Sequence, residues 1–423
     1  LLNVIDVTML GQLGEVSIAA VGLANQVFFL LMLMLFGANS GMGVFNAQLW
    51  GKGDVKSIHK VLGIGLMIGL AGSVVFTILA LLLPGPVLRI FTTDQAVIAS
   101  GVSYLRIIGW SYPMTAVTFA FSSVLRSTGH VREPMIVSTV ALSLKTLLNY
   151  GLILGHFGLP ALGVEGAAIA TVIARVVEMV AMLAMIYARK LPAAARVSEL
   201  VSADRQFLAT VLKTSLPVLV NETLWSLGVT MYNVVYGRIG TDAIAAVNIA
   251  SSIENLAFVV FMGLSDATGI MVGNLIGAKE EDVAYAYGRQ TLIISTVGAI
   301  SLGIVILVGR DLILSLYKLT PESLVLARNI LTVMGFALWV KVSNMTIIVG
   351  ILRAGGDTRF SLFLDTGTVW LVGVPLAVLG GLVLHLPVYV VYLMVIADEA
   401  FKYAIGLWRF STKRWINNVA EAV

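Results

Sequence analysis

This 423-residue chain contains no cysteine, and charged residues make up only 12% of it. Without cysteine there can be no disulfide bond and no thiolate nucleophile or metal ligand. A soluble domain normally carries about 25% charged residues, so the scarcity of charge excludes an ordinary soluble protein. The sequence has no Walker-type phosphate loop, and its four histidines show no metal-ligand spacing. We therefore expect no cofactor, no resident metal and no use of ATP.

The chain is instead rich in long apolar stretches, with 58% hydrophobic residues and a mean hydropathy of +0.96. Each stretch approaches the roughly 20 residues that span a bilayer core, and the stretches are continuous rather than alternating, which predicts helices. We therefore expect an all-α integral membrane protein with twelve transmembrane helices. Their expected ranges are 1–11 (a first helix truncated at Leu1), 17–47, 60–84, 101–125, 134–156, 163–188, 210–236, 243–273, 290–309, 327–352, 360–384 and 387–409.

The two halves of the sequence resemble each other. The stretch GQLGEVSIAAVGLANQ from Gly11 aligns without a gap on GRIGTDAIAAVNIASS from Gly237, and the same offset places Gln48 on Asn274 and Gly51 on Gly277. Six helices per half make a parallel repeat, a pattern typical of one large class of secondary transporters. The expected organisation is an N-terminal lobe at 1–188, a cytoplasmic amphipathic linker at 189–208, a C-terminal lobe at 209–410 and a cytoplasmic tail at 411–423.

A short polar motif recurs in both halves, as VLRSTGHVRE and ILRAGGDTRF. Lys and Arg are concentrated in the C-terminal tail and in the loops that follow the second, fourth, sixth, eighth and tenth expected helices (the even-numbered loops). The positive-inside rule makes these segments cytoplasmic. The motif then ends a helix on the cytoplasmic side, where its arginines favour the helix carbonyls and anionic headgroups. Its glycine allows a left-handed exit from the helix. We interpret the motif as a hinge and an anchor rather than as a catalytic element.

Ionisable residues inside spanning helices are costly, and each is a hypothesis for function. In the first half, Asp6 lies in the first helix, while Lys145 and Asn149 are four apart on one face of the fifth. Thr171 adds a hydroxyl from the sixth helix. A carboxylate, an amide and a hydroxyl suit a proton or a small cation, so we expect an ion-coupling site here. The alternative is an Asp6–Lys145 ion pair that only fixes packing.

In the second half, Glu222, Glu254, Asp266 and Lys341 predict a second polar cluster that faces the lobe interior and serves ion coupling or substrate binding. Mutual neutralisation of these charges is the alternative. In the last helix, the spacing of Asp398 and Lys402 predicts a pair near water at the helix end. The remaining charges in the expected spans are Arg175, Glu178, Asp365 and Glu399.

Aromatic residues and methionine at helical spacing could line a pocket for flat, apolar solutes or simply pack the core. The candidates for a cavity lining are Phe36, Trp225, Met231, Tyr232 and Tyr236.

The chain resembles the multidrug and toxic compound extrusion (MATE) transporters over essentially its whole length. The resemblance rests on VIDVTMLGQLG, AAVGLANQ, VLRSTGHVREP, LLNYGLILGHFGLPALGVEGAAIAT and ILRAGGDTRF. It implies two six-helix lobes and export of amphipathic, often cationic aromatic compounds in exchange for H⁺ or transiently bound Na⁺. It also implies the first-helix acid at Asp6, the polar pair at Lys145 and Asn149, and the threonine at Thr171. Lys145 departs from the family, where Asn is common, so its ammonium could occupy the place of a Na⁺.

From these patterns we expect a monomeric multidrug antiporter of the plasma membrane (the cell inner membrane), with small-molecule substrates and no enzymatic activity or nucleic-acid partner. Three alternatives stay open. A lipid-linked saccharide flippase would need a strongly cationic central cavity. An intramembrane enzyme would need convergent acid, base or metal residues at one depth, and no such spacing is present. A passive pore is disfavoured by the different charges of the two halves.

Overall fold

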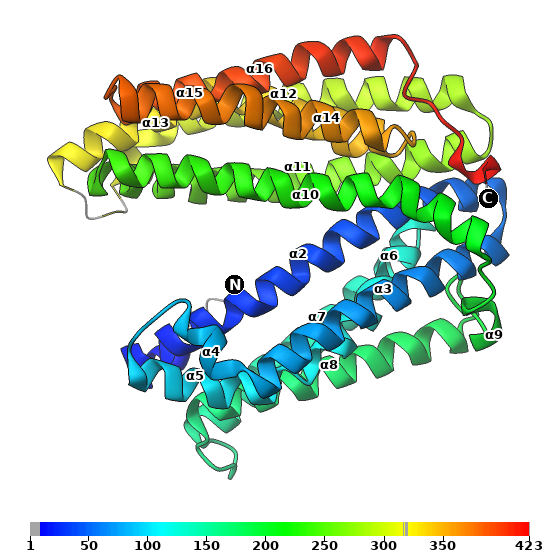
Figure 1. The fold of residues 1–423 in the computed structure, drawn as a ribbon, viewed down its shortest axis with the longest axis horizontal. Helices are drawn as coiled ribbons and strands as arrows, with labels where there is room; N and C mark the ends of the chain where they lie inside the picture. Colours follow the sequence, from blue (N-terminus) through cyan, green and yellow to red (C-terminus); the bar gives the residue numbers. More distant parts are fainter. Residues whose placement is uncertain (1–8, 316, 318–319, 423) are drawn as a thin grey trace. The chain divides into compact units, whose positions relative to one another are not determined.

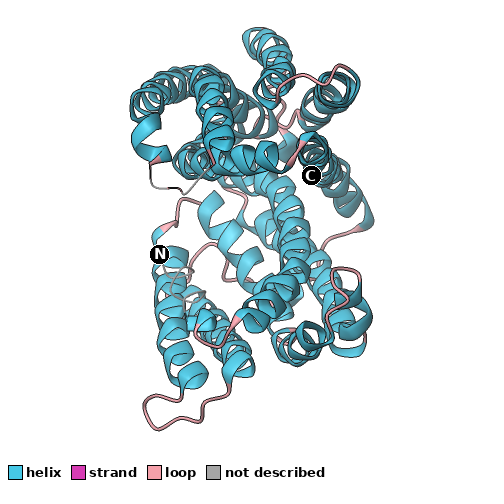
Figure 2. Ribbon diagram, turned by 90° about the vertical axis from the view of Figure 1, so that its left-hand side faces the viewer, coloured by secondary structure: helices cyan, strands magenta, loops and turns pink. Residues whose placement is uncertain are grey.

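The structure is a computed structural model that describes residues 9–315, 317 and 320–422 (Figure 1). These residues form helices joined by loops, as Figure 2 shows, and their strand-type pairing is limited to an isolated bridge between Gly356 and Ile416. The chain divides into two compact units. The first comprises the described residues up to 42 together with 55–208, and the second comprises 43–54 together with the described residues from 209 onward.

The first unit is built from helices that mostly match the expected spans. In order they are α2 (Glu15–Lys52, whose last turns belong to the second unit), α3 (Val55–Leu82), α4 (Pro84–Arg89), α5 (Gln95–Ile108), α6 (Ser111–Ser127), α7 (Arg132–Leu154), α8 (Gly163–Ala188) and α9 (Val197–Leu200). The single helix expected at 101–125 is interrupted between α5 and α6. Pro113 has no N–H for the Gly109 carbonyl, which accepts a hydrogen bond from the Thr77 hydroxyl at 3.0 Å instead.

The second unit contains longer helices, several with π-helical stretches. They are α10 (Arg205–Ile239), α11 (Thr241–Gly277), α12 (Glu281–Leu314), α13 (Pro321–Met345) continued by η1 (Thr346–Arg353), α14 (Thr358–Thr368), η2 (Val369–Gly373), α15 (Val374–Val378), η3 (Leu379–Val383) and α16 (Val388–Ser411). Eight of the described helical runs are long and apolar enough to cross a membrane. Large apolar side chains remain exposed along them, as expected of a protein that lipid surrounds.

The end of α2 packs closely against the end of α11, through residues that the sequence repeat makes equivalent. A Cβ atom at Gly51 would collide with the Asn274 carbonyl oxygen, and one at Gly277 would collide with the Gln48 carbonyl oxygen. Gln48 and Asn274 are one repeat pair, and Gly51 and Gly277 are another. The contact is therefore reciprocal, and it requires glycine on both helices because the backbones touch.

The expected left-handed glycine in the repeated motif is present in both copies, with φ +81° at Gly129 and φ +80° at Gly356. The expectation that both arginines serve as surface anchors is wrong for Arg353, because its side chain is only 4% exposed and lies inside the second unit. Arg353 ends the π-helical stretch η1, and we ascribe its inward direction to this stretch, which changes the helical register relative to an α-helix.

The C-terminal segment 411–422 packs onto the second unit rather than extending from it as a free tail. Trp415 is fully buried, and the Asn417 amide donates to the Gly355 carbonyl at 2.8 Å. The Val419 amide donates to Gln48 Oε1 at 2.7 Å, and Lys52 donates to the Ala420 carbonyl at 2.6 Å. These bonds explain why 43–54 belongs to the second unit.

The segment after α8 is also packed. It carries α9, and Leu200 leaves no room for a side chain at Gly63. His59 is bonded to Glu199 at 3.1 Å and to the Pro192 carbonyl at 2.9 Å. The Arg196 amide and His59 hold the pKa of the Glu199 carboxyl below its usual range. The two hydrogen bonds of His59 fix the segment to α3.

Candidate functional sites

The first unit contains a cavity of about 630 Å³ between α2, α5, α6, α7 and α8. Lys145 and Asn149 from α7 and Thr171 from α8 all line it. The structure therefore brings together three of the four residues predicted for an N-terminal ion-coupling site. The fourth, Asp6, lies outside the described residues. The four-residue spacing of Lys145 and Asn149 puts both on the same face of α7, as the sequence suggests.

A charged pair on α8 adds to the polar wall of this cavity. Glu178 is buried, and it accepts hydrogen bonds from the Arg175 guanidinium and the Ser138 hydroxyl, both at 2.7 Å. The Arg175 guanidinium lies 5.9 Å from the centre of the Phe28 ring, a cation–π distance. Both charges are recognisable in the sequence as ionisable residues of a spanning helix, but the sequence does not show that they share a cavity with Lys145.

The second unit does not join its four predicted site residues into one cluster. Lys341 pairs with Glu254 at 2.6 Å, and the Tyr392 hydroxyl donates to the second Glu254 oxygen at 3.1 Å. Glu222 pairs instead with Arg353 at 2.6 Å. Asp266 has an exposed side chain, so the prediction that it lies near Glu254 in an inward-facing cluster is wrong: twelve residues along α11 leave the two side chains on different faces.

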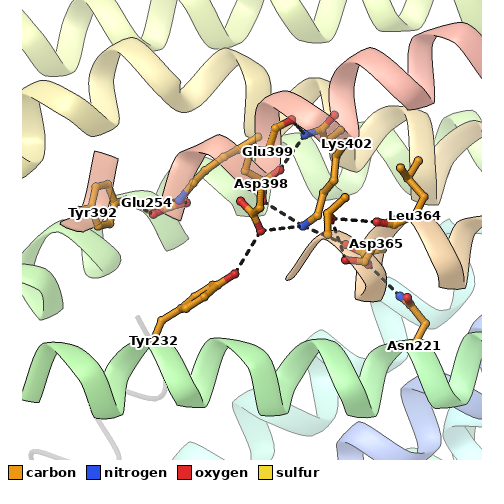
Figure 3. Close-up of polar contacts among 12 residues, drawn as sticks. Asn221, Tyr232, Glu254, Leu364, Asp365, Tyr392, Asp398, Glu399 and Lys402 are labelled. Atoms are coloured by element: carbon orange, nitrogen blue, oxygen red, sulfur yellow. Dashed lines mark hydrogen bonds and ion pairs between the residues drawn. The ribbon is translucent and has the colours of Figure 1, made fainter. Parts of the chain in front are cut away.

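A larger charged network surrounds Lys402 on α16, next to the Glu254 side chain that pairs with Lys341 (Figure 3). The Lys402 ammonium lies 3.2 Å from Asp365, 3.3 Å from Glu399 and 3.5 Å from Asp398. The Arg353 guanidinium, which holds Glu222, is 3.8 Å from Asp365 and extends the network to α10. We call these six residues the Lys402 network: Glu222, Arg353, Asp365, Asp398, Glu399 and Lys402.

Neutral donors complete the shell of the Lys402 network. Asn221 donates to Asp365 at 2.9 Å, Asn344 donates to Glu399 at 2.7 Å, and the Tyr232 hydroxyl donates to Asp398 at 3.2 Å. The predicted Asp398–Lys402 contact is present, but both residues are only 2% exposed, so the expected position near water is wrong. The helix end at Ser411 lies more than two turns further on. The sequence does contain one pattern that points to this site: Asp398, Glu399 and Lys402 lie within about one turn of an otherwise apolar helix.

The five aromatic and methionine candidates occupy different environments. Trp225 is 42% exposed, and Phe36 and Met231 are half-buried. Tyr232 and Tyr236 lie in the hydrophobic core of the second unit, and the Tyr236 ring packs 6.3 Å from that of Tyr392. Core packing, the alternative considered from the sequence, accounts for these two tyrosines.

The model of the family MatE matches residues 1–151 and 217–379 of this chain. The chain belongs to the MatE family. MatE proteins are transporters, so the resemblance stated from the sequence is confirmed, and the chain is a multi-pass membrane protein. The family match covers both halves, in keeping with the internal repeat.

Relatives and solved structures agree with the MatE assignment. The chain is 27% identical over 416 residues to an uncharacterized transporter, YisQ, of Bacillus subtilis, covering 97% of this chain and 90% of YisQ. It is 26% identical to a probable multidrug resistance protein, NorM, of Thermotoga maritima, covering 98% and 89%. A mutant of the Vibrio cholerae MATE transporter VcmN has the same fold, with a TM-score of 0.87, 19% identity and coverage of 99% and 94%. This MatE fold has twelve helices in two bundles, which confirms the predicted fold class.

Proposed function

We propose that this MatE protein is a secondary active multidrug efflux antiporter that exports amphipathic, often cationic aromatic compounds. The relatives named as multidrug resistance proteins support this proposal. The observation that carries it is the cavity in the first unit, whose lining includes the aromatic rings of Phe28 and Tyr104. Aromatic walls suit a flat organic cation, because ring faces attract positive charge.

We assign the exchanged ion as H⁺ rather than Na⁺. Lys145 lines the cavity at the position where the family commonly has Asn, and an ammonium there competes with a metal cation for the same acceptors. The role of Asp6 rests on the sequence alone. Proton uptake by Asp6 would release Lys145 from it and shift the balance between the two access states.

The proposed location is the plasma membrane, with the even-numbered loops and the C-terminus in the cytoplasm and the protein as a monomer. The concentration of Lys and Arg in these loops supports the orientation.

Export of a fluorescent organic cation from everted vesicles, with pH and Na⁺ gradients imposed separately, tests this function. We expect the pH gradient alone to drive export. We expect Asp6→Asn to lower this export about tenfold or more, the effect of removing a bias of roughly 1.4 kcal/mol between states. Asp311→Asn is the control, because Asp311 forms an exposed pair with Arg328. Export that follows only the Na⁺ gradient, or an Asp6→Asn protein that matches the wild type, would contradict the assignment.

A second candidate, a flippase for lipid-linked saccharides, is favoured by one observation. Lys145 and Arg175 both line the cavity, and cations suit a phosphate-bearing headgroup. The solved structure of a transporter from Pyrococcus furiosus, with a TM-score of 0.83, 20% identity and coverage of 98% of this chain and 92% of that one, has been described as having a binding pocket of reversed polarity. We rank this candidate second because Glu178 already neutralises Arg175. The vesicle assay separates the two, since a flippase would not export the dye.

A further inference from the structure

We infer that the second unit holds a coupling proton of its own, carried by the Asp398 carboxyl within the Lys402 network. The inference deepens the proposed antiport, which assigns a proton only to the first unit, and its role in transport rests on that proposal. The protonated state itself can be tested without any drug.

The Lys402 network contains more acids than bases. Four carboxyl groups, Glu222, Asp365, Asp398 and Glu399, share the two cations Arg353 and Lys402. If every carboxyl were ionised, two negative charges would lack a counter-ion in a network whose side chains are at most 18% exposed. An uncompensated buried charge is costly, and a carboxyl avoids that cost by taking up a proton.

Neighbouring cations do not remove the excess. Lys341 on α13 is already paired with Glu254 at 2.6 Å, and Lys402 is the cation within ion-pair distance of Asp398 among the residues that the structure describes. The other groups that face the network are neutral or acidic. They are Asn221 and Tyr232 on α10, Glu254 on α11, Asn344 on α13, Thr366 on α14 and Tyr392 on α16.

Asp398 has the weakest compensation of the four carboxyls. Glu222 has a direct Arg353 contact at 2.6 Å, Asp365 touches both cations and Asn221, and Glu399 has Lys402 and the Asn344 amide. Asp398 has only the longest of the Lys402 contacts and the Tyr232 hydroxyl, both on Oδ2. Its other oxygen, Oδ1, is fully buried and has no hydrogen-bond partner among the described residues. A buried ionised carboxylate is stabilised by hydrogen-bond donors, and Oδ1 has none among the described residues while Oδ2 has two, so we place the proton on Oδ1.

The surrounding backbone keeps the Asp398–Tyr232 contact in place. Gly373, at the end of the π-helical stretch η2, lies against both side chains, and a Cβ atom there would collide with the Tyr232 hydroxyl. The glycine thus leaves space for the hydroxyl to reach Asp398 Oδ2. Figure 3 shows the contact between Tyr232 and Asp398. With Oδ2 accepting this hydrogen bond as the carbonyl oxygen and Oδ1 carrying hydrogen, the group is a neutral carboxylic acid.

Lys402 gives the site a means of releasing its proton. Its ammonium lies within 3.5 Å of three carboxyls, so a small movement of α16 relative to α14 transfers it from Asp365 towards Asp398. The O–H bond at Oδ1 then breaks, and a water molecule admitted by this movement accepts the proton. Lys402 neutralises the new Asp398 carboxylate, and Arg353 remains as the counter-ion of Asp365. An organic cation near the network would favour the same release.

Infrared difference spectroscopy of the purified full-length protein, titrated from acidic to alkaline pH, tests the inference. We expect the wild type to show the C=O band of a buried protonated carboxyl, and Asp398→Asn to lose one carboxyl equivalent of this band. Tyr232→Phe should keep the band and move it to higher wavenumber, because the carbonyl loses its hydrogen bond. Glu399→Gln and the exposed-site control Asp311→Asn should leave the band in place.

An Asp398→Asn spectrum that keeps the full band would overturn the inference, and so would loss of the band in Glu399→Gln instead. If Asp398→Asn does not fold, Tyr232→Phe decides, because an unmoved band in that variant also overturns it. No drug and no gradient enter this experiment. Its failure is therefore distinguishable from failure of the vesicle assay, which would refute proton antiport while leaving the protonated carboxyl intact.

Discussion

Replacing Lys402 by methionine is expected to destabilise the second unit by about 3–5 kcal/mol, the usual cost of removing one partner from a buried ion pair. Lys402 is only 2% exposed and contacts Asp365, Asp398 and Glu399. The methionine side chain is similar in length to that of lysine, so the loss of stability would come from the missing charge rather than from a cavity. The measurement is thermal or denaturant-induced unfolding of the detergent-solubilised protein.

The matched control is Lys413→Met, which breaks an exposed pair with Asp282. We expect little change there, because solvent screens exposed pairs. Combining Lys402→Met with Glu399→Gln should recover part of the loss, since the second change removes one stranded charge, and a coupling of about 1 kcal/mol or more is expected for such contacting residues. Purely additive effects, or a Lys402→Met protein as stable as the wild type, would contradict the charge-sharing arrangement.

Replacing Gly277 by alanine is expected to destabilise the protein by about 1–3 kcal/mol, because overpacking forces a backbone shift. The added Cβ atom would collide with the Gln48 carbonyl, a backbone group that cannot rotate away as a side chain could. Gly51→Ala should have a similar effect, since its Cβ atom would meet the equivalent Asn274 carbonyl. Unfolding measurements on both variants test this.

Gly263→Ala on the same helix, α11, makes the same chemical change where nothing lies within 4 Å of the added atom. There we expect no loss, or a gain of about 0.5–1 kcal/mol, because alanine is the better helix former. Equal effects at Gly263 and Gly277 would show that helix propensity, and not the crossing of α2 and α11, determines the outcome.

The sequence predicts the fold of this protein well because lipid imposes a strong and local rule. A run of about 20 apolar residues must satisfy its backbone internally and becomes a helix. The repeat offset in the sequence also makes Gln48 equivalent to Asn274 and Gly51 equivalent to Gly277. In the structure these four residues form the contact between α2 and α11, with Gly51 against Asn274 and Gly277 against Gln48. The expected ranges do not include the break at Gly109, although Pro113 is a sequence signal for it. The Thr77 hydroxyl that bonds to the Gly109 carbonyl lies on another helix and is not visible in the local sequence.

The candidate sites were predicted less completely, because helical spacing gives the face of one helix but not its neighbour. Lys145, Asn149 and Thr171 line one cavity. Helical spacing predicts the shared face of Lys145 and Asn149 on α7, and the family resemblance implies Thr171 beside them. Glu222 was assigned to the wrong partners, because its true partner Arg353 is 131 positions away and had been expected at the membrane surface.

The amino-acid sequence by itself determined that this chain is a twelve-helix membrane protein with an internal repeat, because hydropathy and repeat spacing are properties of the order of residues. Only the tertiary structure decided which charges share a site. The register change in η1 and the packing of α14 against α16 bring Arg353, Asp365 and Lys402 together in a buried network. Burial and counter-charge depend on neighbours from distant segments, and no local pattern specifies them.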